Sequence, residues 1–536
     1  MMVGNRCLSI FRKLLALPCS ASIVAYLAIG CGGGGSPVSP QPQDFSLSVS
    51  PSTISMTVGT VGPTVTIAIS GQDGFADTVN VAIAGLPNGA FTSPPSPLTF
   101  PASGSQKVNL FIPSTTAPGS LSIGFNATSG SLSHGVKLNI TATPVSGTAV
   151  LQDASGQVAA GTIEIQGLSA GTFNPTFWQN NTLNWVPDVR VPILAPQTTG
   201  TYHNIYAPWA LEQSGGWRLF YGGWDGQDVP FDQIFSVTTS DFLSFANRDH
   251  IIANGDFVNV NNVNVQQLPD GSLHMICTGG SPPGRPGDEP VYFSSPDGVT
   301  WNGSVEPYSA QVADIIDIQG YSLFTSGNFN GANVLLRDND VWVLYFTDWQ
   351  NDSDTIHRAT ASVLPNFQLE GTALKTTHAV NDVKKILVNG TAWYLMGLHN
   401  NDQSLRYSLS NDGVSFLPEQ SLFSHVSAQD VYIVAIGFVM RGSELLGALY
   451  GASAVETLDQ NQIFARWLQK KVVITDSTGV EYFAQGGYGP DRQWFQAPTS
   501  GTIEGTVVVY AEDGVTQLGS SLVTLTAGKA YDLLLN

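Results

Sequence analysis

The chain has 536 residues, with 41 acidic and 21 basic side chains and a formal net charge of −20. This length is too great for one hydrophobic core, and the acidic balance argues against nucleic acid as a partner. Short alternating apolar runs, punctuated by Gly, Asn and Asp, dominate the sequence, and no long helical periodicity is found. This pattern predicts an all-β fold class with several domains.

The N-terminus begins with a basic segment followed by an apolar stretch over residues 14–28, which has the length of a signal peptide. The stretch ends in Leu-Ala-Ile-Gly before Cys31 and resembles the lipobox of bacterial lipoproteins, although Ala28 stands where Leu is usual. The resemblance implies a signal peptide over 1–30 and lipidation at Cys31. An ordinary signal peptide or an uncleaved anchor helix is the alternative.

A Gly/Ser/Pro/Gln run follows Cys31 and predicts a flexible tether over residues 31–44. Such a lipoprotein would be exported and held in the cell envelope by its lipid alone, and Gly32 after the cysteine implies the outer membrane. Of the other cysteines, Cys7 and Cys19 leave with the signal, so Cys277 has no disulfide partner. Its apolar surroundings predict a buried, inert thiol.

Residues 45–143 contain short strands of period two separated by turn residues, which predict a β-sandwich. The stretch resembles the Ig-like modules of secreted bacterial proteins, and we expect it to act as a spacer. Residues 147–199 are expected to be a linker with strands leading into the next domain. Part of it, residues 148–166, is expected to pair with a C-terminal β-sandwich module over residues 471–536.

Residues 200–470 carry an internal repeat of three strands and a shared turn. The strand-opening runs recur five times, and an aromatic lies four residues after the turn Asp in Phe245, Trp301 and Phe416. The repeat predicts a five-bladed β-propeller whose first strands line a central channel. The three aromatics are expected to be buried packing residues.

Polar residues lead these first strands and should converge on one cavity at the channel mouth. We expect His203, Asn262, Asn333, Asp382 and Asp430 to line it. Amide and carboxylate groups bond sugar hydroxyls, and Trp209, Tyr206 or Trp224 can stack on a sugar ring. The alternative is that Asn and Asp begin strands because they form turns. The expected partner is a polysaccharide or oligosaccharide.

The layout resembles the five-bladed glycosidases of the arabinanase, xylosidase and invertase groups over about half of the chain. The resemblance implies a pair of catalytic carboxylates. The sequence lacks both at the usual places, where it has Ala207-Pro208 and Asn330-Gly331-Ala332-Asn333. Asp382 and Asp430 are the candidate catalytic residues, and Lys384 is expected to keep Asp382 ionised. A missing partner could come from connecting segments, at Asp256, Asp314, Asp317 or Glu289.

The substrate-binding candidates are His203, Asn204, Trp209, Asn262, Asn333 and Lys384. Neither a cofactor nor a metal is expected, because the histidines lack zinc spacing and the cluster of Asp348, Asp352 and Asp354 fits a solvated acidic loop. Two functions stay open. One is a surface or periplasmic lipoprotein with a glycoside hydrolase-like propeller that acts on or binds carbohydrate. The other is a non-catalytic surface module that binds glycan or protein.

Overall fold

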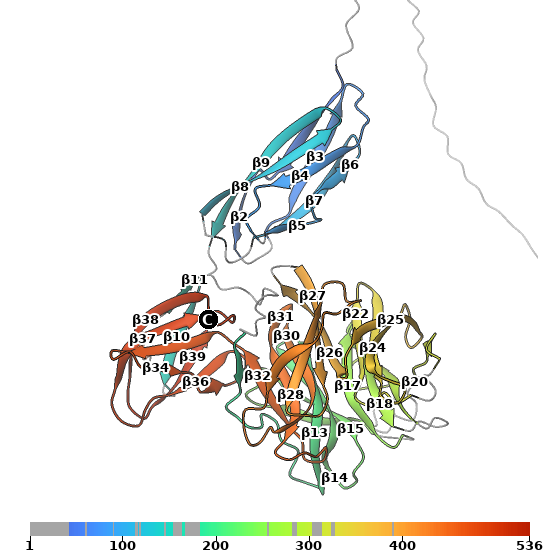
Figure 1. Cartoon of the computed structure of the whole chain (residues 1–536), viewed down its shortest axis with the longest axis vertical. Helices are drawn as coiled ribbons and strands as arrows, with labels where there is room; N and C mark the ends of the chain where they lie inside the picture. The colour runs from blue at the N-terminus through green and yellow to red at the C-terminus, as the bar shows by residue number, and fades with distance from the viewer. Residues whose placement is uncertain are drawn as a thin grey trace, which may run out of the picture.

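A computed structural model of the chain describes residues 42–58, 62–88, 90–112, 116, 119–143, 146–153, 163–166, 183–253, 257–280, 287–302, 314–322, 327–388 and 391–535. Every regular element in these ranges is a strand, which confirms the all-β fold class. The strands form an N-terminal sandwich, a propeller and a C-terminal sandwich (Figure 1). The predicted signal peptide and Cys31 lie outside the described residues. Within them, no helix has the length and apolarity needed to cross a membrane.

The N-terminal sandwich consists of two sheets whose facing side chains alternate with exposed ones, as in β3, where Val65, Ile67 and Ile69 are buried. One sheet has the order β1 (Asp44–Ser50), β3 (Val65–Gln72), β7 (Gly104–Phe111) and β5 (Phe91–Ser93). The other has the order β2 (Thr53–Thr57), β9 (Leu132–Thr143), β8 (Gly119–Ser129), β4 (Val79–Ala84) and β6 (Leu98–Phe100).

The propeller has five sheets, which confirms the predicted number of blades. Blade one contains β13 (Tyr202–Gln213), β14 (Gly216–Gln227), β15 (Gln233–Thr239) and β16 (Ala246–Ile252). Blade two contains β17 (Val260–Gln267), β18 (Leu273–Gly280), β19 (Asp288–Ser295) and β20 (Asp314–Ile315). Blade three contains β22 (Asn333–Asp338), β23 (Val341–Asp348), β24 (Asp352–Ala361), β25 (Phe367–Lys375) and β21 (Ile318–Gln319).

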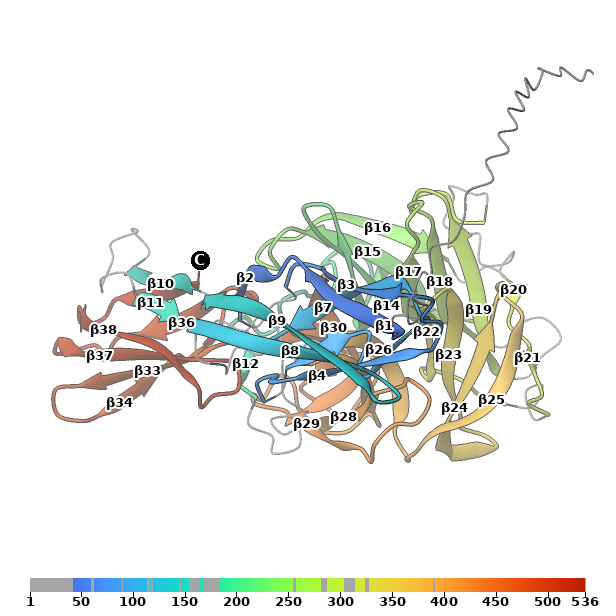
Figure 2. The same cartoon turned by 90° about the horizontal axis from the view of Figure 1, so that it is seen from above.

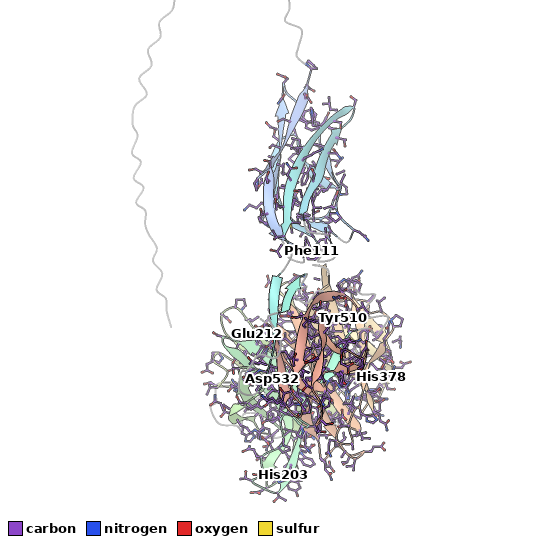
Figure 3. All side chains as sticks on the ribbon, turned by 90° about the vertical axis from the view of Figure 1, so that its left-hand side faces the viewer. Phe111, His203, Glu212, His378, Tyr510 and Asp532 are labelled. Carbon is purple, nitrogen blue, oxygen red and sulfur yellow. The ribbon has the colours of Figure 1, made fainter. Side chains whose placement is uncertain are left out.

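Blade four contains β26 (Ala379–Val388), β27 (Thr391–His399), β28 (Ser404–Ser410) and β29 (Gln420–Ser424). Blade five contains β30 (Tyr432–Arg441), β31 (Glu444–Ser453), β32 (Gln462–Leu468) and β12 (Trp185–Pro187). The first strands β13, β17, β22, β26 and β30 contact one another in turn, and β30 contacts β13 again. They therefore surround the propeller axis. Figure 3 shows His203 and Glu212, near opposite ends of β13, on different sides of the propeller.

The propeller closes because a strand that precedes the first blade in sequence completes the last blade. β12 precedes the first blade in sequence but pairs antiparallel with β32 of the last blade. Next to it, Asp188 is buried, accepts a hydrogen bond from Trp467 Nε1 (2.8 Å) and pairs with Arg190 (2.8 Å). Burying a charged pair costs free energy, and additional hydrogen bonds to the carboxylate oxygens, such as the one from Trp467, offset that cost. Arg190 also donates to the Leu243 carbonyl oxygen of blade one (3.1 Å), so these contacts hold the first and last blades together.

The shared turn is built the same way in three blades. In two of them the residue after the Asp is a glycine with positive φ, Gly298 (75°) and Gly413 (68°). In blade one Phe242 takes this position with φ 59°, and its ring is fully buried against Trp217 and Trp467. Phe242 therefore fills the core position expected for Phe245, which is only partly buried. Trp301 and Phe416 are buried as predicted.

The C-terminal module lies beside the propeller in both views (Figures 1 and 2). Its β10 (Ser146–Asp153) pairs with β39 (Ala530–Leu535), so the partnership expected for residues 148–166 is present. The first sheet adds β11 (Ile163–Gln166), β36 (Arg492–Gln496) and β35 (Gly486–Gly487). The second sheet has the order β34 (Glu481–Phe483), β33 (Lys471–Asp476), β37 (Ile503–Tyr510) and β38 (Gln517–Leu525).

Candidate functional site

The first strands share a backbone irregularity near the propeller axis. β13, β17, β26 and β30 each carry a register shift at corresponding places, and Ala207, Asn262 and Ala435 there have φ of 48°, 54° and 76°. Left-handed backbone is costly for a residue with a Cβ atom, and bulges and such strain cluster at functional sites. These three residues, with Asn333 and Asn381, line one small cavity of about 10 Å³. The irregularities thus converge at the centre of the propeller.

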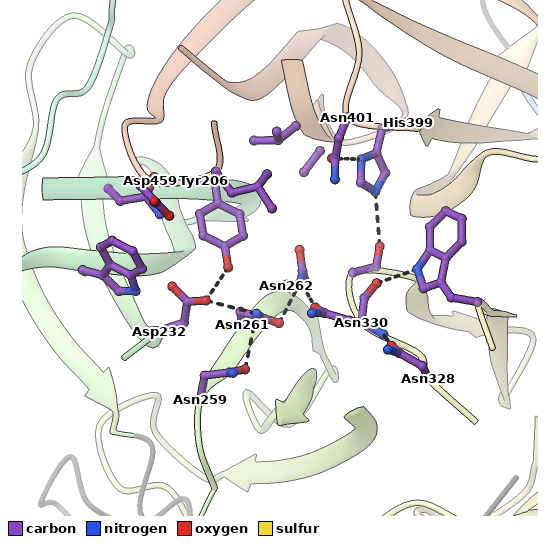
Figure 4. Close-up of a pocket in the computed structure, with 17 residues that line it drawn as sticks. Tyr206, Asp232, Asn259, Asn261, Asn262, Asn328, Asn330, His399, Asn401 and Asp459 are labelled. Carbon is purple, nitrogen blue, oxygen red and sulfur yellow. Dashed lines mark hydrogen bonds between the residues drawn. The ribbon is translucent and has the colours of Figure 1, made fainter. Parts of the chain in front are cut away.

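A larger cavity of about 460 Å³, which we call the axial pocket, shares Asn262 and Ala435 with this small one (Figure 4). Its volume lies in the range of small-molecule sites. All five blades contribute lining residues. These are Asn204, Tyr206, Trp224, Asp232, Asn259, Asn261, Asn262, Asn328, Asn330, Gly331, Trp349, His399, Asn401, Val434, Ala435, Leu458 and Asp459.

Side-chain amides form a connected network along one wall of the axial pocket. Asn262 Nδ2 donates to Asn261 Oδ1 (2.7 Å) and to Asn330 Oδ1 (3.2 Å). Asn261 Nδ2 in turn donates to Asp232 Oδ2 (3.2 Å), and the Asn328 side chain accepts from the Asn330 backbone N–H (3.1 Å). Because each amide has two donor hydrogens and two acceptor lone pairs, the network fixes the side chains and still leaves groups for a ligand.

Aromatic side chains flank the amides. Trp349 is half-buried, and its Nε1 donates to the Asn330 carbonyl oxygen (2.8 Å). Trp224 is also half-buried and packs edge-on against Tyr202, with ring centroids 5.7 Å apart. Tyr206 donates its hydroxyl hydrogen to Asp232 Oδ2 (2.7 Å). Held rings of this kind offer apolar faces next to polar groups, which is the composition of a sugar-binding surface.

Asp232 is a half-buried residue of the axial pocket whose carboxyl Oδ1 is shielded from solvent. Its Oδ2 has the two donors Tyr206 and Asn261, whereas Oδ1 has no hydrogen-bond partner among the described residues. Burial raises the pKa of Asp232, and the negative charge of Asp459 adds to the rise, while the hydrogen bonds oppose it. Asp459 itself is exposed on the rim. The two carboxylates therefore face a shared space in which a second negative charge is unfavourable.

His399 is the lone histidine of the axial pocket. Its Nδ1 lies 2.9 Å from Asn401 Oδ1, and the side chain is buried. Burial lowers the pKa of His399 to about 4, so the ring is neutral near pH 7. The pocket thus has no side chain with a positive charge at neutral pH, since its lining, all in the described part of the chain, includes neither Lys nor Arg.

The structure brings only some of the predicted site residues into this pocket. Asn204, Tyr206, Trp224 and Asn262 line it. His203 lies on a separate cavity with Gln197, Thr198, Gln429, Gln460 and Gln462. Asn333 meets Asn262 only in the small cavity, and Asp382 and Asp430 line neither cavity. The expectation that His203, Asn333, Asp382 and Asp430 share one pocket with Asn262 is therefore corrected.

Asp382 and Lys384 lie in the packed centre of the propeller and not at the axial pocket. Asp382 is fully buried and accepts from the Phe438 backbone N–H (2.6 Å). Trp209, predicted to stack on a sugar, is buried, and its ring lies 3.2 Å from Lys384 Nζ. The side chains at alternate positions of an inner strand point into the core here, which explains why the predicted face is closed.

Asp430 and Asn333 are occupied by bonds within the fold. The Asp430 carboxylate accepts from the backbone N–H and hydroxyl of Ser427 (2.7 and 2.8 Å) and from Tyr450 OH (3.0 Å). This is the turn-forming role that Asp plays before strands. Asn333 is buried and donates to Thr278 Oγ1 (3.0 Å). The catalytic roles of Asp382 and Asp430 stay predictions.

The other carboxylate candidates fall elsewhere. Glu289 and Asp317 are described and do not line the axial pocket, whereas Asp256 and the side chain of Asp314 lie outside the described residues. Asp348 is the last residue of β23 and is fully buried, so the expectation that it belongs to a solvated loop is corrected. It accepts from the backbone of Gln350 (3.0 Å) and Asn351 (3.1 Å) in the turn that follows. No group of three possible metal ligands occurs among the described residues.

The sequence interpretation missed Asp232, Trp349, Asn401 and Asp459. All four lie between the second and third strand of a blade. In an antiparallel blade the second strand ends where the first begins, so these connections surround the same channel mouth. The available signal was therefore positional: polar and aromatic residues just after each second strand.

No protein-family model and no curated protein matches the chain. Solved structures that resemble it include the catalytic domain of a GH62 α-L-arabinofuranosidase from Coprinopsis cinerea, with 12% identity, 53% of this chain and 96% of that chain covered, and a TM-score of 0.41. A GH32 β-fructofuranosidase from Bombyx mori has 11% identity, coverage of 67% and 96%, and a TM-score of 0.37. A family 117 glycoside hydrolase from Zobellia galactanivorans has 11% identity, coverage of 53% and 90%, and a TM-score of 0.36. These identities and TM-scores are too low to support a functional argument, so the function proposed below rests on the axial pocket alone.

Proposed function

We propose that the chain binds carbohydrate in the axial pocket of its propeller. The observation that carries the proposal is the pocket's composition, in which seven asparagines accompany the rings of Trp224, Trp349 and Tyr206. Amides pair with neighbouring sugar hydroxyls, and rings cover the apolar face of a sugar. The hydrogen-bonded amide network lowers the entropy lost on binding, because its side chains are already ordered.

Binding of an oligosaccharide panel by calorimetry tests the proposal. Trp349→Ala should weaken binding by about tenfold, since it removes a stacking face worth about 1.4 kcal/mol. Trp393→Ala is the matched control: Trp393 is also half-buried, but it lies near the start of β27, whereas the pocket lies at the strand's other end, at His399. Equal losses for both variants would contradict the assignment.

Hydrolysis of the bound glycan is a second candidate function. It is favoured by the presence of two carboxylates, Asp232 and Asp459, in the one pocket. Glycosidases use such a pair, with a protonated member as acid, and burial raises the pKa of Asp232 as that role requires. Release of reducing ends by the wild type, abolished in Asp232→Asn, would support hydrolysis. Binding without release would leave a binding protein.

Attachment to the cell envelope is a further part of the proposal. It is supported by the lipobox-like residues before Cys31 and by the Gly-rich run after it. A tether of this composition would let the propeller reach glycans at some distance from the membrane.

A further inference from the structure

We infer that the ligand of the axial pocket is a cationic amino sugar, whose free ammonium group lies against the carboxylates of Asp232 and Asp459. This inference rests on the proposed function and narrows it to a substrate class. Neutral sugars need only the amides and rings. The two carboxylates add negative charge to the pocket, which a cationic ligand would neutralise and a neutral ligand would not.

The charge of the axial pocket is the first support. Among the described residues, its lining contains two carboxylates, neither Lys nor Arg, and a histidine that burial keeps neutral. The pKa of Tyr206 is raised first by burial, then by the charge of Asp232, and further by the charge of Asp288. Asp288 therefore adds to the negative field at the pocket. Negative charges gathered in a partly desolvated cavity repel one another, and a cation placed between them relieves that repulsion.

The hydrogen bonding of Asp232 is the second support. Tyr206 and Asn261 hold one oxygen in place, while Oδ1 is buried and lacks a donor among the described residues. The Trp224 indole N–H lies close enough to lower the pKa of Asp232, yet neither Trp224 Nε1 nor Asp232 Oδ1 has a hydrogen bond of normal geometry among the described residues. A ligand ammonium carries three donors and could supply the missing one after a small rotation of the carboxylate.

The aromatic residues are the third support. Tyr206, Trp224 and Trp349 line the same cavity as the two carboxylates. Aromatic faces attract ammonium groups, and a carboxylate beside such rings is a recurring arrangement for amine recognition. The asparagines at 259, 261, 262 and 330 would then bond the hydroxyls of the same sugar.

Calorimetric titration with β-1,4-linked glucosamine oligomers, and with the fully N-acetylated oligomers of equal length, tests the inference. N-acetylation removes the positive charge and keeps the sugar ring. We expect the glucosamine oligomer to bind about 10- to 100-fold more tightly, the range for a charge-assisted hydrogen bond. The preference should shrink as salt is raised, since the rim carboxylate is exposed to screening.

Asp232→Asn, which keeps the shape of the side chain, should reduce the preference for the glucosamine oligomer by about tenfold or more. Asp340→Asn is the control, because Asp340 is fully exposed in a turn outside the pocket. Equal binding of both oligomers, or a preference that survives in Asp232→Asn, would overturn the inference and leave the carbohydrate proposal standing. Failure to bind these oligomers together with every neutral oligosaccharide would instead reject the carbohydrate proposal itself.

Discussion

The ammonium of Lys384 lies 3.4 Å from Asp382 Oδ1 in the centre of the propeller, with the lysine side chain 13% exposed and the carboxylate fully buried. Burial raises the pKa of Asp382 to about 6, against the opposing effect of Lys384, and burial also lowers the pKa of Lys384. The pair sits among the first strands, and Asp382 also accepts from Phe438 on the neighbouring strand. The ion pair lies within β26 of blade four, and the hydrogen bond from Phe438 connects it to blade five.

Removing one partner of this pair should destabilise the protein. Asp382→Asn leaves the Lys384 charge buried beside Trp209, and we expect a loss of about 3–5 kcal/mol in the free energy of unfolding. Urea unfolding followed by tryptophan fluorescence measures it. The double variant Asp382→Asn/Lys384→Met should recover most of that loss. An unchanged stability for Asp382→Asn, combined with loss of glycan turnover, would support the catalytic role predicted from the sequence instead.

His399 should make stability depend on pH below neutrality. Its pKa is about 4 in the folded chain, below the ordinary value of 6.5, so the unfolded state takes up the proton first as pH falls. The contribution of His399 to the free energy of unfolding is constant above pH 6.5 and declines as pH falls from 6.5 to 4. From pH 7 to pH 5 the wild type should lose about 2 kcal/mol more than His399→Gln. Parallel pH profiles of unfolding free energy for the two proteins would show that this histidine is not buried in its neutral form.

The propeller's blade contacts rest on large aromatics such as Trp301, which is 1% exposed in the core between blades one and two. Trp301→Ala should cost about 3–5 kcal/mol of stability. Phe245→Ala should cost clearly less, because Phe242 fills the corresponding core position in blade one. Thermal and urea unfolding of the two variants compares them directly. A larger loss for Phe245→Ala would mean that the packing of the shared turn is misassigned.

The blades could be predicted because, apart from β12 in blade five, each one is built from strands adjacent in sequence, so its apolar alternation repeats along the chain. The axial pocket could not be predicted to the same extent. Ala207 and Ala435 adopt positive φ, which cannot be predicted from the sequence because neither position has the Gly or Asn typical of that conformation. Asp232 and Asp459 lie in connections of unequal length, which carry no period, and their meeting depends on blades far apart in sequence. Asp382 obeyed the strand pattern but faces the core.

Cys31 lies outside the described residues, so its lipidation is predicted from the sequence alone. Cys31→Ser should abolish lipid attachment and leave an unprocessed precursor, because the thiol is the acceptor of the lipid in the lipoprotein pattern that residues 27–31 resemble. Detergent-phase partition of the expressed protein and the mass of its N-terminus measure the outcome. Partition of the Cys31→Ser variant into detergent at the wild-type level, with a normally cleaved N-terminus, would contradict lipidation at this residue.

The central claim is that the axial pocket binds carbohydrate, and its most direct test is a crystal structure of the purified protein soaked with the tightest-binding oligosaccharide from the calorimetric panel. We predict electron density for a sugar ring between Trp224 and Trp349, with hydroxyls bonded to Asn262 and Asn330. The residues that line the pocket come from all five blades, so a ring there would contact several of them at once. An oligosaccharide bound elsewhere on the chain, with the axial pocket filled only by water, would contradict the account.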